Sequence, residues 1–293
     1  MTLNDNSWAD ISEIALAGTG DTYWDLGDAK EITFKSGATI GTLSVSGLTL
    51  CVFILSFNHV DGNVADNNIL FGGFKSGLTN GKDVALVDSN YNNQVTGATK
   101  AFNWEHWSTS SQTSYTYGGW RGCDLRYDIL GATTTAPSGY GSKTTSGRTG
   151  YNATQGTIDN PLANTLMAAI PDDFRVVLRL RTHYTDNFGN KSTSAGNVTA
   201  VVDAVSLLSE TEIQGGTSNS NPHESEKQTE MGYYAAGNSR IRYKHNAILY
   251  ASTWLTTSQA VISYTKAVYT DQNGASGTIS NSYSLGIAPV FKV

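Results

Sequence analysis

The chain lacks the residues that crosslink small secreted domains or build sulfur-rich metal sites. Among its 293 residues there are only two cysteines, Cys51 and Cys123. Two cysteines form at most one bridge, so the sequence excludes a disulfide framework and a zinc site with four cysteine ligands. Because a chain of this length can bury a sizeable core, we expect a fold that is stable without such crosslinks.

Charged residues are also scarce. They make up 15% of the chain, compared with about 25% in average soluble domains, so the surface must consist mainly of uncharged polar residues. Such a surface is typical of secreted, fibrous or virion proteins. The net charge of −6 argues against nucleic acid as a partner, because non-specific affinity for phosphates comes from clustered Lys and Arg.

Long apolar runs are missing as well. The longest, residues 48–57, is too short to span a bilayer, so we expect no membrane insertion and interpret it as a buried strand. Residues 1–6 lack the basic start and apolar stretch of a secretory signal. A virion protein fits this combination, because particles assemble inside the cell and leave by lysis. A cytosolic protein, or a mature chain after removal of a signal, fits it too.

Helical signals are few and short. Ser7 is placed to cap a helix that ends at Gly18. A second helix is predicted from Asn160 as N-cap to the residue before Pro171, and a third over residues 124–130.

Most other ordered segments have the pattern of strands. Residues 48–57 are apolar on both faces, which predicts a central strand. Residues 174–184 and 240–244 alternate between apolar and basic side chains, which predicts strands with a solvated basic face; the alternative is that this face meets an acidic partner or subunit. Further strands are predicted at residues 32–45, 84–87, 198–208, 261–269 and 284–291.

These elements predict the fold class. Strands scattered among two or three short helices indicate an α+β, mainly β architecture. We expect one elaborated domain over residues 1–293, with long polar loops as possible insertions at residues 133–157, 186–197 and 214–232.

Four short motifs follow one another along the chain: Gly27-Asp28-Ala29-Lys30, Phe57-Asn58-His59, the glycine-rich segment 118–126 and the closing segment 286–291. In this order they resemble an uncharacterised domain family that recurs in phage structural proteins and bacterial surface proteins. The resemblance implies a virion location, with the bacterial cell surface as the alternative.

The closing segment, with Trp254 before it, also resembles the end of C-type-lectin-like domains related to formylglycine-generating enzymes and to the variable proteins of diversity-generating retroelements. This resemblance implies a C-type-lectin-like domain whose late-chain surface meets a ligand. Such domains often carry an Arg-Ser pair after the Trp, where this chain has threonines and a serine. Their local hydrogen-bonding pattern therefore does not carry over.

The late chain also has the composition of a recognition surface, in which rigid aromatic residues give contact area and small polar residues give adaptable hydrogen bonds. The alternative is that these are ordinary sheet residues, since Tyr and Thr favour strands. The expected ligand-binding residues are Trp254, Thr256, Ser258, Gln259, Tyr264, Tyr269, Asn273 and Tyr283.

Groups that carry chemistry are few. His59 precedes Asp61 by two residues at a strand end, a place where catalytic and ligand residues occur, but the simpler interpretation is an imidazole that holds a loop by hydrogen bonds. In segment 118–126 we expect Trp120 to fill the core beneath a tight glycine turn, in preference to a glycan site. No cysteine follows Cys123, which argues against the paired-cysteine oxidase chemistry of formylglycine-generating enzymes.

Calcium is not expected either. The sugar-coordinating Glu-Pro-Asn and Gln-Pro-Asp triplets of calcium-dependent lectins are absent. Two groups of oxygen donors lack the full spacing of a calcium loop, namely Asp61, Asn63 and Asp66, and Asp186, Asn187 and Asn190. We therefore predict no metal, no cofactor and no catalytic residue.

Together these observations predict a non-enzymatic virion protein for host attachment, either a tail-associated receptor-binding protein or a head-decorating adhesin. Its partner would be cell-surface polysaccharide or protein, bound by late-chain loops, and we expect a homo-oligomer. One alternative is a purely structural capsid or tail component that binds other virion proteins. Another is a hydrolase of host glycan, which requires two carboxylates facing one cleft.

Overall fold

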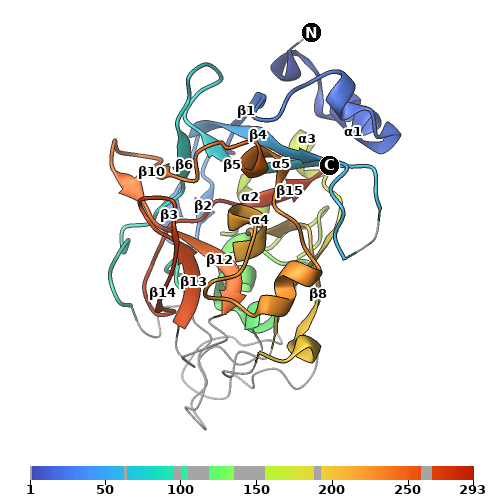
Figure 1. Cartoon of the computed structure of the whole chain (residues 1–293). Coiled ribbons are helices and arrows are strands. Elements are labelled where there is room, and N and C mark those ends of the chain that lie inside the picture. Colours follow the sequence, from blue (N-terminus) through green and yellow to red (C-terminus); the bar gives the residue numbers. More distant parts are fainter. Residues whose placement is uncertain are drawn as a thin grey trace.

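The fold is α+β and mainly β, as the sequence predicts (Figure 1). The computed structural model describes residues 2–62, 65–95, 100–104, 119–134, 156–187, 193–258 and 266–293. The largest core cluster begins at Leu3 and ends at Val293, so segments from both ends of the sequence pack together. Both cysteines are buried and free, which rules out a bridge between them.

The largest sheet has the strand order β1-β4-β5-β6-β10-β11. β4 is antiparallel to both β1 and β5 and is buried along most of its length, which confirms the predicted central strand. The far edge of β5 is shared by β6 and β15, and β15 in turn pairs with β9. These strands are β1 (Ala29–Thr33), β4 (Thr49–Phe57), β5 (Ile69–Lys75), β6 (Asp83–Ala85), β9 (Val205–Ser206), β10 (Arg242–Lys244), β11 (Tyr250–Ala251) and β15 (Val290–Lys292).

Smaller sheets complete the β structure of the described residues. Each is antiparallel. Their strands are β2 (Thr39–Ile40) with β3 (Leu43–Ser44), β7 (Arg181–Asp186) with β8 (Val198–Asp203), and β12 (Thr253–Ser258) with β13 (Lys266–Thr270) and β14 (Ser276–Ser280). The predicted strand at 284–291 is shorter than expected, because isolated bridges precede β15. Of the strand predicted at 261–269, the part before residue 266 lies outside the described residues.

The helices are short. The α-helices are α1 (Trp8–Ala17), α2 (Leu166–Ala169), α3 (Asp172–Arg175), α4 (Glu210–Gln214) and α5 (Gly232–Ala235). Single turns of 3₁₀ helix are η1 (Leu3–Asp5), η2 (Gly20–Thr22), η3 (Gly119–Gly122), η5 (Ala195–Asn197) and η6 (Pro222–Glu226), and η4 (Leu125–Leu130) is a π-helix. None of the described helices is long and apolar enough to cross a membrane.

Two helix predictions are confirmed, and the third helix begins later in the chain than predicted. Ser7 caps α1 and Gly18 ends it in a left-handed conformation, as predicted. η4 lies where the helix over 124–130 was expected. Asn160, however, caps no helix, because its backbone closes a turn with Thr157. α2 starts only after Thr165, whose hydroxyl accepts a hydrogen bond from Ala168 N.

The prediction of a solvated basic strand face is wrong. In segment 174–184 the apolar residues Val176 and Leu180 are 58% and 47% exposed, whereas Arg181 is 1% exposed. Arg242 in β10 is buried as well. The predicted strand at 174–184 is wrong before residue 181, because residues 172–175 form α3 and β7 begins only at Arg181. The alternation does not define two faces there, since Leu178 is 4% exposed whereas Val176 and Leu180 are exposed. Arg181 and Arg242 lie inside because Asp61 and the Tyr234 hydroxyl accept hydrogen bonds from them.

The loop at 214–232 is ordered by polar contacts and contains η6. The Glu210 carboxylate accepts hydrogen bonds from the backbone of Asn219 and Ser220, and the Asn221 amide donates to Asp186. The loop predicted at 186–197 is described except for 188–192, and most of 133–157 lies outside the described residues.

Candidate functional site

Two of the residues expected to form the late-chain ligand surface, Trp254 and Thr256, lie in the core. Trp254 is 1% exposed, and its indole N–H donates to Phe102 O at 2.7 Å. Thr256 is fully buried, and its backbone N–H donates to Leu208 O at 3.0 Å. β12 is covered on both faces, so the prediction that Trp254 and Thr256 face a ligand is wrong.

The remaining late-chain candidates divide into three kinds. Tyr269 and Tyr283 are half-buried and pack against the main core cluster. Asn273 is exposed in the turn between β13 and β14, where Asp271 Oδ1 accepts its backbone N–H at 2.8 Å. Gln259, Tyr264 and the side chain of Ser258 lie outside what the structure describes. The structure does not gather these candidates into one surface.

A different late-chain surface is prominent. The turn that joins β10 to β11 carries three consecutive exposed hydrophobic residues: Ile248 at 86%, Leu249 at 59% and Tyr250 at 50% exposure. Exposed apolar groups that lie together mark interaction sites more often than isolated ones do. The sequence contained the signal, an apolar run directly after Lys244-His245-Asn246, but an apolar run reads equally well as a strand.

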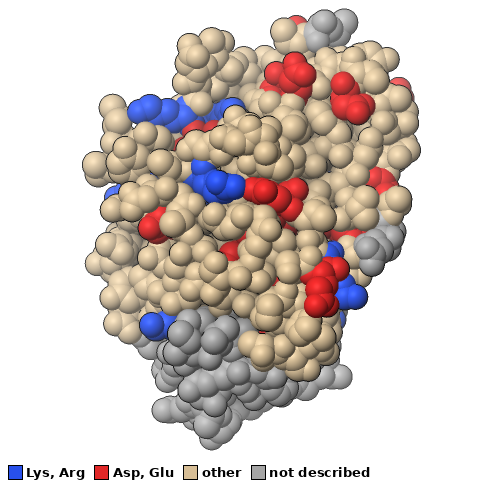
Figure 2. Space-filling model, in the orientation of Figure 1, with Lys and Arg blue, Asp and Glu red and all other residues tan. Residues whose placement is uncertain are grey.

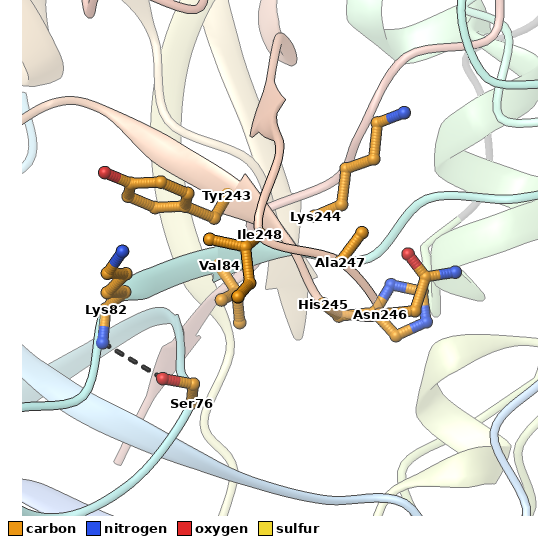
Figure 3. Close-up of a pocket in the computed structure, with 9 residues that line it drawn as sticks. All are labelled: Ser76, Lys82, Val84, Tyr243, Lys244, His245, Asn246, Ala247 and Ile248. Carbon is orange, nitrogen blue, oxygen red and sulfur yellow. Dashed lines mark hydrogen bonds between the residues drawn. The ribbon is translucent and has the colours of Figure 1, made fainter.

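Aromatic rings and lysines surround this turn (Figure 3). The ammonium of Lys82 lies 4.3 Å from the ring centroid of Tyr243, and that of Lys244 lies 4.3 Å from the ring centroid of Tyr91. Tyr243 and Tyr250 face each other with centroids 4.9 Å apart. We call the set Lys82, Tyr91, Tyr243, Lys244, Ile248, Leu249 and Tyr250 the hairpin surface.

A pocket of about 370 Å³ opens beneath the turn, with Ile248 and Tyr243 on its wall. It is held open by the backbone, because Lys244 N–H donates to Leu249 O at 2.8 Å and His245 N–H donates to Ala85 O at 3.0 Å. On the face seen in Figure 2, charged side chains are scattered among uncharged atoms. The hairpin surface therefore combines aromatic, aliphatic and cationic groups.

A second pocket, of about 360 Å³, lies at the end of β4 and is polar. We call it the polar pocket; its lining residues are His59, Asp61, Ala65, Asp66, Thr182 and Lys292. Sequence analysis singled out His59 and Asp61. It missed Glu212, because 151 positions separate Glu212 from Asp61. The Glu212 carboxylate lies in one cluster with the His59 imidazole and the Asp61 carboxylate.

The backbone fixes His59 firmly. Asn58 adopts a left-handed conformation (φ 46°), and the Asn68 side chain accepts from His59 N–H at 3.2 Å and donates to His59 O at 3.0 Å. Three residues after His59, Gly62 has φ 60°, and a Cβ there would meet the Tyr184 ring at 2.1 Å. The chain therefore turns sharply after β4 and aims the imidazole inward.

Arg181 links the two carboxylates of the cluster. Its Nε and Nη2 donate to the two oxygens of Asp61 at 3.2 and 3.1 Å, and Nη2 also donates to Glu212 Oε1. Glu212 Oε2 accepts from Ser209 N–H at 2.8 Å, in the capping box of α4. This arrangement neutralises one of two buried negative charges by the bidentate geometry that arginine favours.

His59 itself is electrically neutral. Burial and the nearby Arg181 guanidinium lower the pKa of its imidazole to about 4, against a smaller opposing effect of Asp61. Its Nε2 lies 3.6 Å from Asp61 Oδ1 and has no hydrogen-bond partner within the described part of the chain. The interpretation that this imidazole holds its loop by hydrogen bonds is therefore wrong for Nε2; the loop is held through the His59 backbone.

At the rim of the polar pocket, Asp66 pairs with Arg179 at 2.8 Å and with Lys292. The calcium donors weighed in the sequence, Asp61 and Asp66, are thus both engaged by cations, and Asn63 lies outside the described residues. In the second group, Asp186 accepts a hydrogen bond from Asn221 and the Asn187 amide donates to Thr199. No group of oxygens at a calcium loop's spacing is brought together among the described residues.

The glycine-rich motif builds a closed hub around Asp203. Trp120 Nε1 donates to Asp203 at 2.9 Å, Arg126 Nε donates at 2.8 Å, and His183 Nε2 lies 2.9 Å from the same carboxylate. Each of these side chains is at most 1% exposed. Despite burial, the charge of Arg126 and the hydrogen bond from His183 hold the pKa of Asp203 far below its usual value. Trp120 fills the core, as predicted.

Comparison with known proteins gives no relative to reason from. No protein-family model matches the chain, and no match was found among curated proteins or among solved structures. Function must therefore be argued from the surfaces and sites of this chain alone.

Proposed function

We propose that the chain is a non-enzymatic recognition protein of a phage particle, which attaches to the host cell through the hairpin surface. The observation that carries this proposal is the exposure of Ile248, Leu249 and Tyr250 beside two lysine–aromatic pairs. Keeping such apolar groups in water is costly, and covering them with a partner recovers about 25 cal/mol for each Å² buried. Cell-surface protein or polysaccharide is the proposed partner.

The mixture of groups suits recognition. Tyrosines give large rigid contacts, and the lysines add directed charge without a strong overall field. Asn273, which is exposed in the turn between β13 and β14, remains a further candidate contact of the late chain. Trp254 and Thr256 take no part, because a ligand cannot reach them.

The carboxylates that line the polar pocket weigh against the glycan-hydrolase alternative. A glycosidase needs one acidic and one basic carboxyl group free to face the sugar. Here Asp61 is occupied by Arg181, and Asp66 is occupied by Arg179 and Lys292. Ion pairs at both carboxylates therefore weigh against their acting as the acid and the base of a glycosidase.

For the scaffold we propose an elaborated C-type-lectin-like domain, assembled as a homo-oligomer on the virion, with the bacterial cell surface as the alternative location. The closing segment supports this proposal, since Val290 and Phe291 pair with both β5 and β9 in the largest sheet. A late strand that completes the central sheet agrees with the resemblance of that segment.

A purely structural role is the second candidate. It is favoured by the aliphatic character of Ile248 and Leu249, because a protein partner desolvates aliphatic groups more completely than a hydrated polysaccharide does. In that case the hairpin surface would contact another virion protein.

The test compares three versions of the intact protein. Binding to host cells is measured for the natural chain, for the double variant Ile248→Ser, Tyr250→Ser, and for the control Leu16→Ser, a residue 53% exposed on α1. We expect the double variant to lose at least about tenfold in affinity, equal to 1.4 kcal/mol, and the control to bind normally. Equal binding by all three would exclude attachment through the hairpin surface.

Incorporation into particles separates the two candidates. If the double variant binds cells normally but fails to enter particles, the structural role is correct. Release of reducing sugar ends from host polysaccharide by the natural chain would instead establish the hydrolase alternative.

A further inference from the structure

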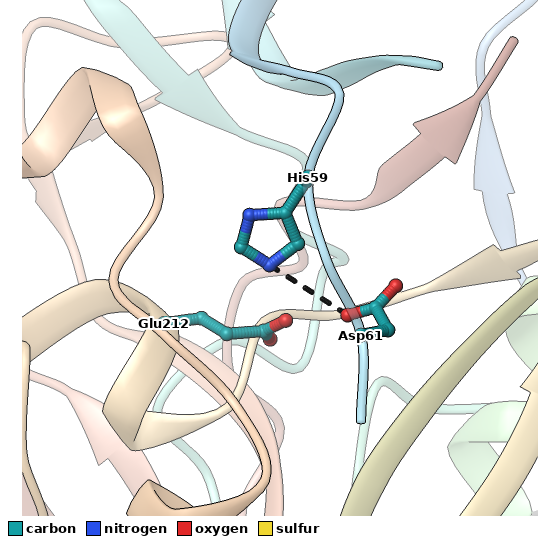
Figure 4. A group of neighbouring side chains, drawn as sticks. All are labelled: His59, Asp61 and Glu212. Atoms are coloured by element: carbon teal, nitrogen blue, oxygen red, sulfur yellow. Dashed lines mark ion pairs between the residues drawn. The ribbon is translucent and has the colours of Figure 1, made fainter. Parts of the chain in front are cut away.

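Three side chains with metal-binding atoms converge beside the polar pocket (Figure 4). They are His59 from the turn after β4, Asp61 two residues later and Glu212 from α4, and one ligand atom from each lies within 4.8 Å of the others. We propose that these three residues bind a divalent transition-metal ion, with Zn²⁺ as the best fit. The site is independent of the proposed attachment surface.

The imidazole gives the strongest indication of a ligand. The His59 side chain is 4% exposed, and its Nε2 points toward the two carboxylates and has no hydrogen-bond partner among the residues that the structure describes. Buried polar atoms without a partner are rare and call for an explanation. Its 3.6 Å separation from Asp61 Oδ1 is too long for a hydrogen bond, yet close to the roughly 3.4 Å between ligand atoms on one tetrahedral zinc ion.

The carboxylates are already oriented for such an ion. Arg181 donates to both oxygens of Asp61 and to one oxygen of Glu212, and Ser209 N–H donates to the second oxygen of Glu212. A carboxylate oxygen has two lone pairs, so it can bind an ion while it accepts a hydrogen bond. Partners of this kind, which hold metal ligands in place from behind, commonly accompany protein metal sites.

Local charge selects the type of ion. Three carboxylates and three cations surround the pocket, so their charges cancel; they are Asp61, Asp66 and Glu212 against Arg179, Arg181 and Lys292. Without a strongly negative potential, binding must come from coordinate bonds. Zn²⁺ forms such bonds with one imidazole and two carboxylates, whereas Ca²⁺ needs six to eight oxygens.

One coordination position would remain for water or a ligand. His59 and Asp61 line the pocket, so the fourth position of a tetrahedral ion can be reached from solvent. An ion there would tie the turn after β4 to α4, two segments that are far apart in the sequence. We therefore expect the ion to stabilise the fold.

The experiment uses the full chain without a histidine tag, treated with a chelator and then dialysed. Zinc chloride is titrated in, with calorimetry for stoichiometry and thermal unfolding for stability. We expect one Zn²⁺ per chain and, at a hundredfold excess over Kd, a rise of roughly 3 to 6 °C in Tm. Calcium chloride should give neither effect. Absence of zinc binding by the natural chain would overturn the proposal.

Variants locate the ion. His59→Ala should weaken zinc binding by a factor of about 100 or more, and Glu212→Gln by at least about 10. The matched control is His223→Ala, which removes the histidine of another histidine–carboxylate pair, with Glu226 at 2.7 Å. The control should keep full affinity. Zinc binding that survives in His59→Ala, or that disappears in His223→Ala, contradicts the assignment.

Cobalt gives a readout that does not depend on the folding of any variant. Co²⁺ added to the natural chain should produce the visible bands of a four-coordinate site with nitrogen and oxygen ligands. A sulfur-to-cobalt charge-transfer band would place the ion at Cys51 or Cys123 and overturn the proposal.

Discussion

Two buried clusters of this protein contain the same kinds of residue but differ in how completely their polar groups are paired. The Asp203 hub and the polar pocket each combine histidine, arginine and carboxylate groups. In the hub, three side chains meet one carboxylate, and every member is sealed from solvent. Beside the polar pocket, the Arg181 guanidinium serves two carboxylates, and His59 lines the pocket with an Nε2 that lacks a hydrogen-bond partner among the described residues. His183 Nδ1 lacks such a partner as well, but it lies inside the sealed hub. The hub has the contacts of a structural clamp, whereas the polar pocket keeps capacity to bind.

The largest effect should come from breaking the hub. Asp203→Asn removes the charge that balances Arg126, while the guanidinium stays buried at 1% exposure. Loss of one partner of a buried ion pair costs about 3 to 5 kcal/mol. Urea unfolding should show a loss of this size. A change below 1 kcal/mol would mean that water or another group compensates Arg126, and the clamp description would fail.

Acid should also act on the hub. Burial lowers the pKa of the His183 imidazole. As the pH falls below 6.5, this imidazole therefore binds a proton more readily in the unfolded chain than in the folded chain. Protons bound preferentially by the unfolded state reduce stability as pH falls, by at most about 1.4 kcal/mol per pH unit for one group. Stability measured between pH 7 and 5 should fall less steeply in His183→Gln. Identical slopes for both chains would contradict this assignment.

The sharpest contrast between the clusters is in their histidines. In zinc-free buffer, His59→Leu should change the unfolding free energy by less than about 1 kcal/mol, because Nε2 has no hydrogen bond to lose. The same substitution at His183 leaves Asp203 short of a donor and should cost about 1 to 3 kcal/mol. Denaturant titration of both variants measures the difference, and equal losses would remove the distinction between the clusters.

The smallest effect is expected at the rim of the polar pocket. Asp66 pairs with Arg179, and both side chains are about 30% exposed. Asp66→Asn should cost about 0.5 to 1 kcal/mol at low ionic strength and less in 1 M salt, because exposed pairs are weak and screened. A loss that does not depend on salt would place Asp66 with the buried residues instead.

The sequence predicted those parts of the fold that depend on neighbouring residues. Ser7 and Gly18 bound α1 because capping acts within one turn. Residues 49–57 form the central strand because apolar side chains occupy both of its faces. Burial of Arg181 was missed because its carboxylate partners are 120 and 31 positions away. The alternating pattern alone gives no reason to bury a charge.

The candidate sites show the same limit. His59 and Asp61 were found together because they are neighbours, whereas Glu212 joins them only through the tertiary fold. Trp254 was expected at a surface because aromatic residues among small polar ones suit both a binding face and a strand. In the structure, Trp254 lies in the interior, where its indole N–H donates a hydrogen bond to Phe102 O.

The position of β15 at the end of the sequence also determines when the largest sheet can be completed during synthesis. One edge of β5 is covered by Val290–Lys292, which a ribosome adds about 220 residues after Ile69. At 5 to 20 residues per second, that edge waits for roughly 10 to 45 seconds. Unpaired strand edges attract other chains, so the nascent protein passes through a period of exposure that ends only when its closing segment emerges.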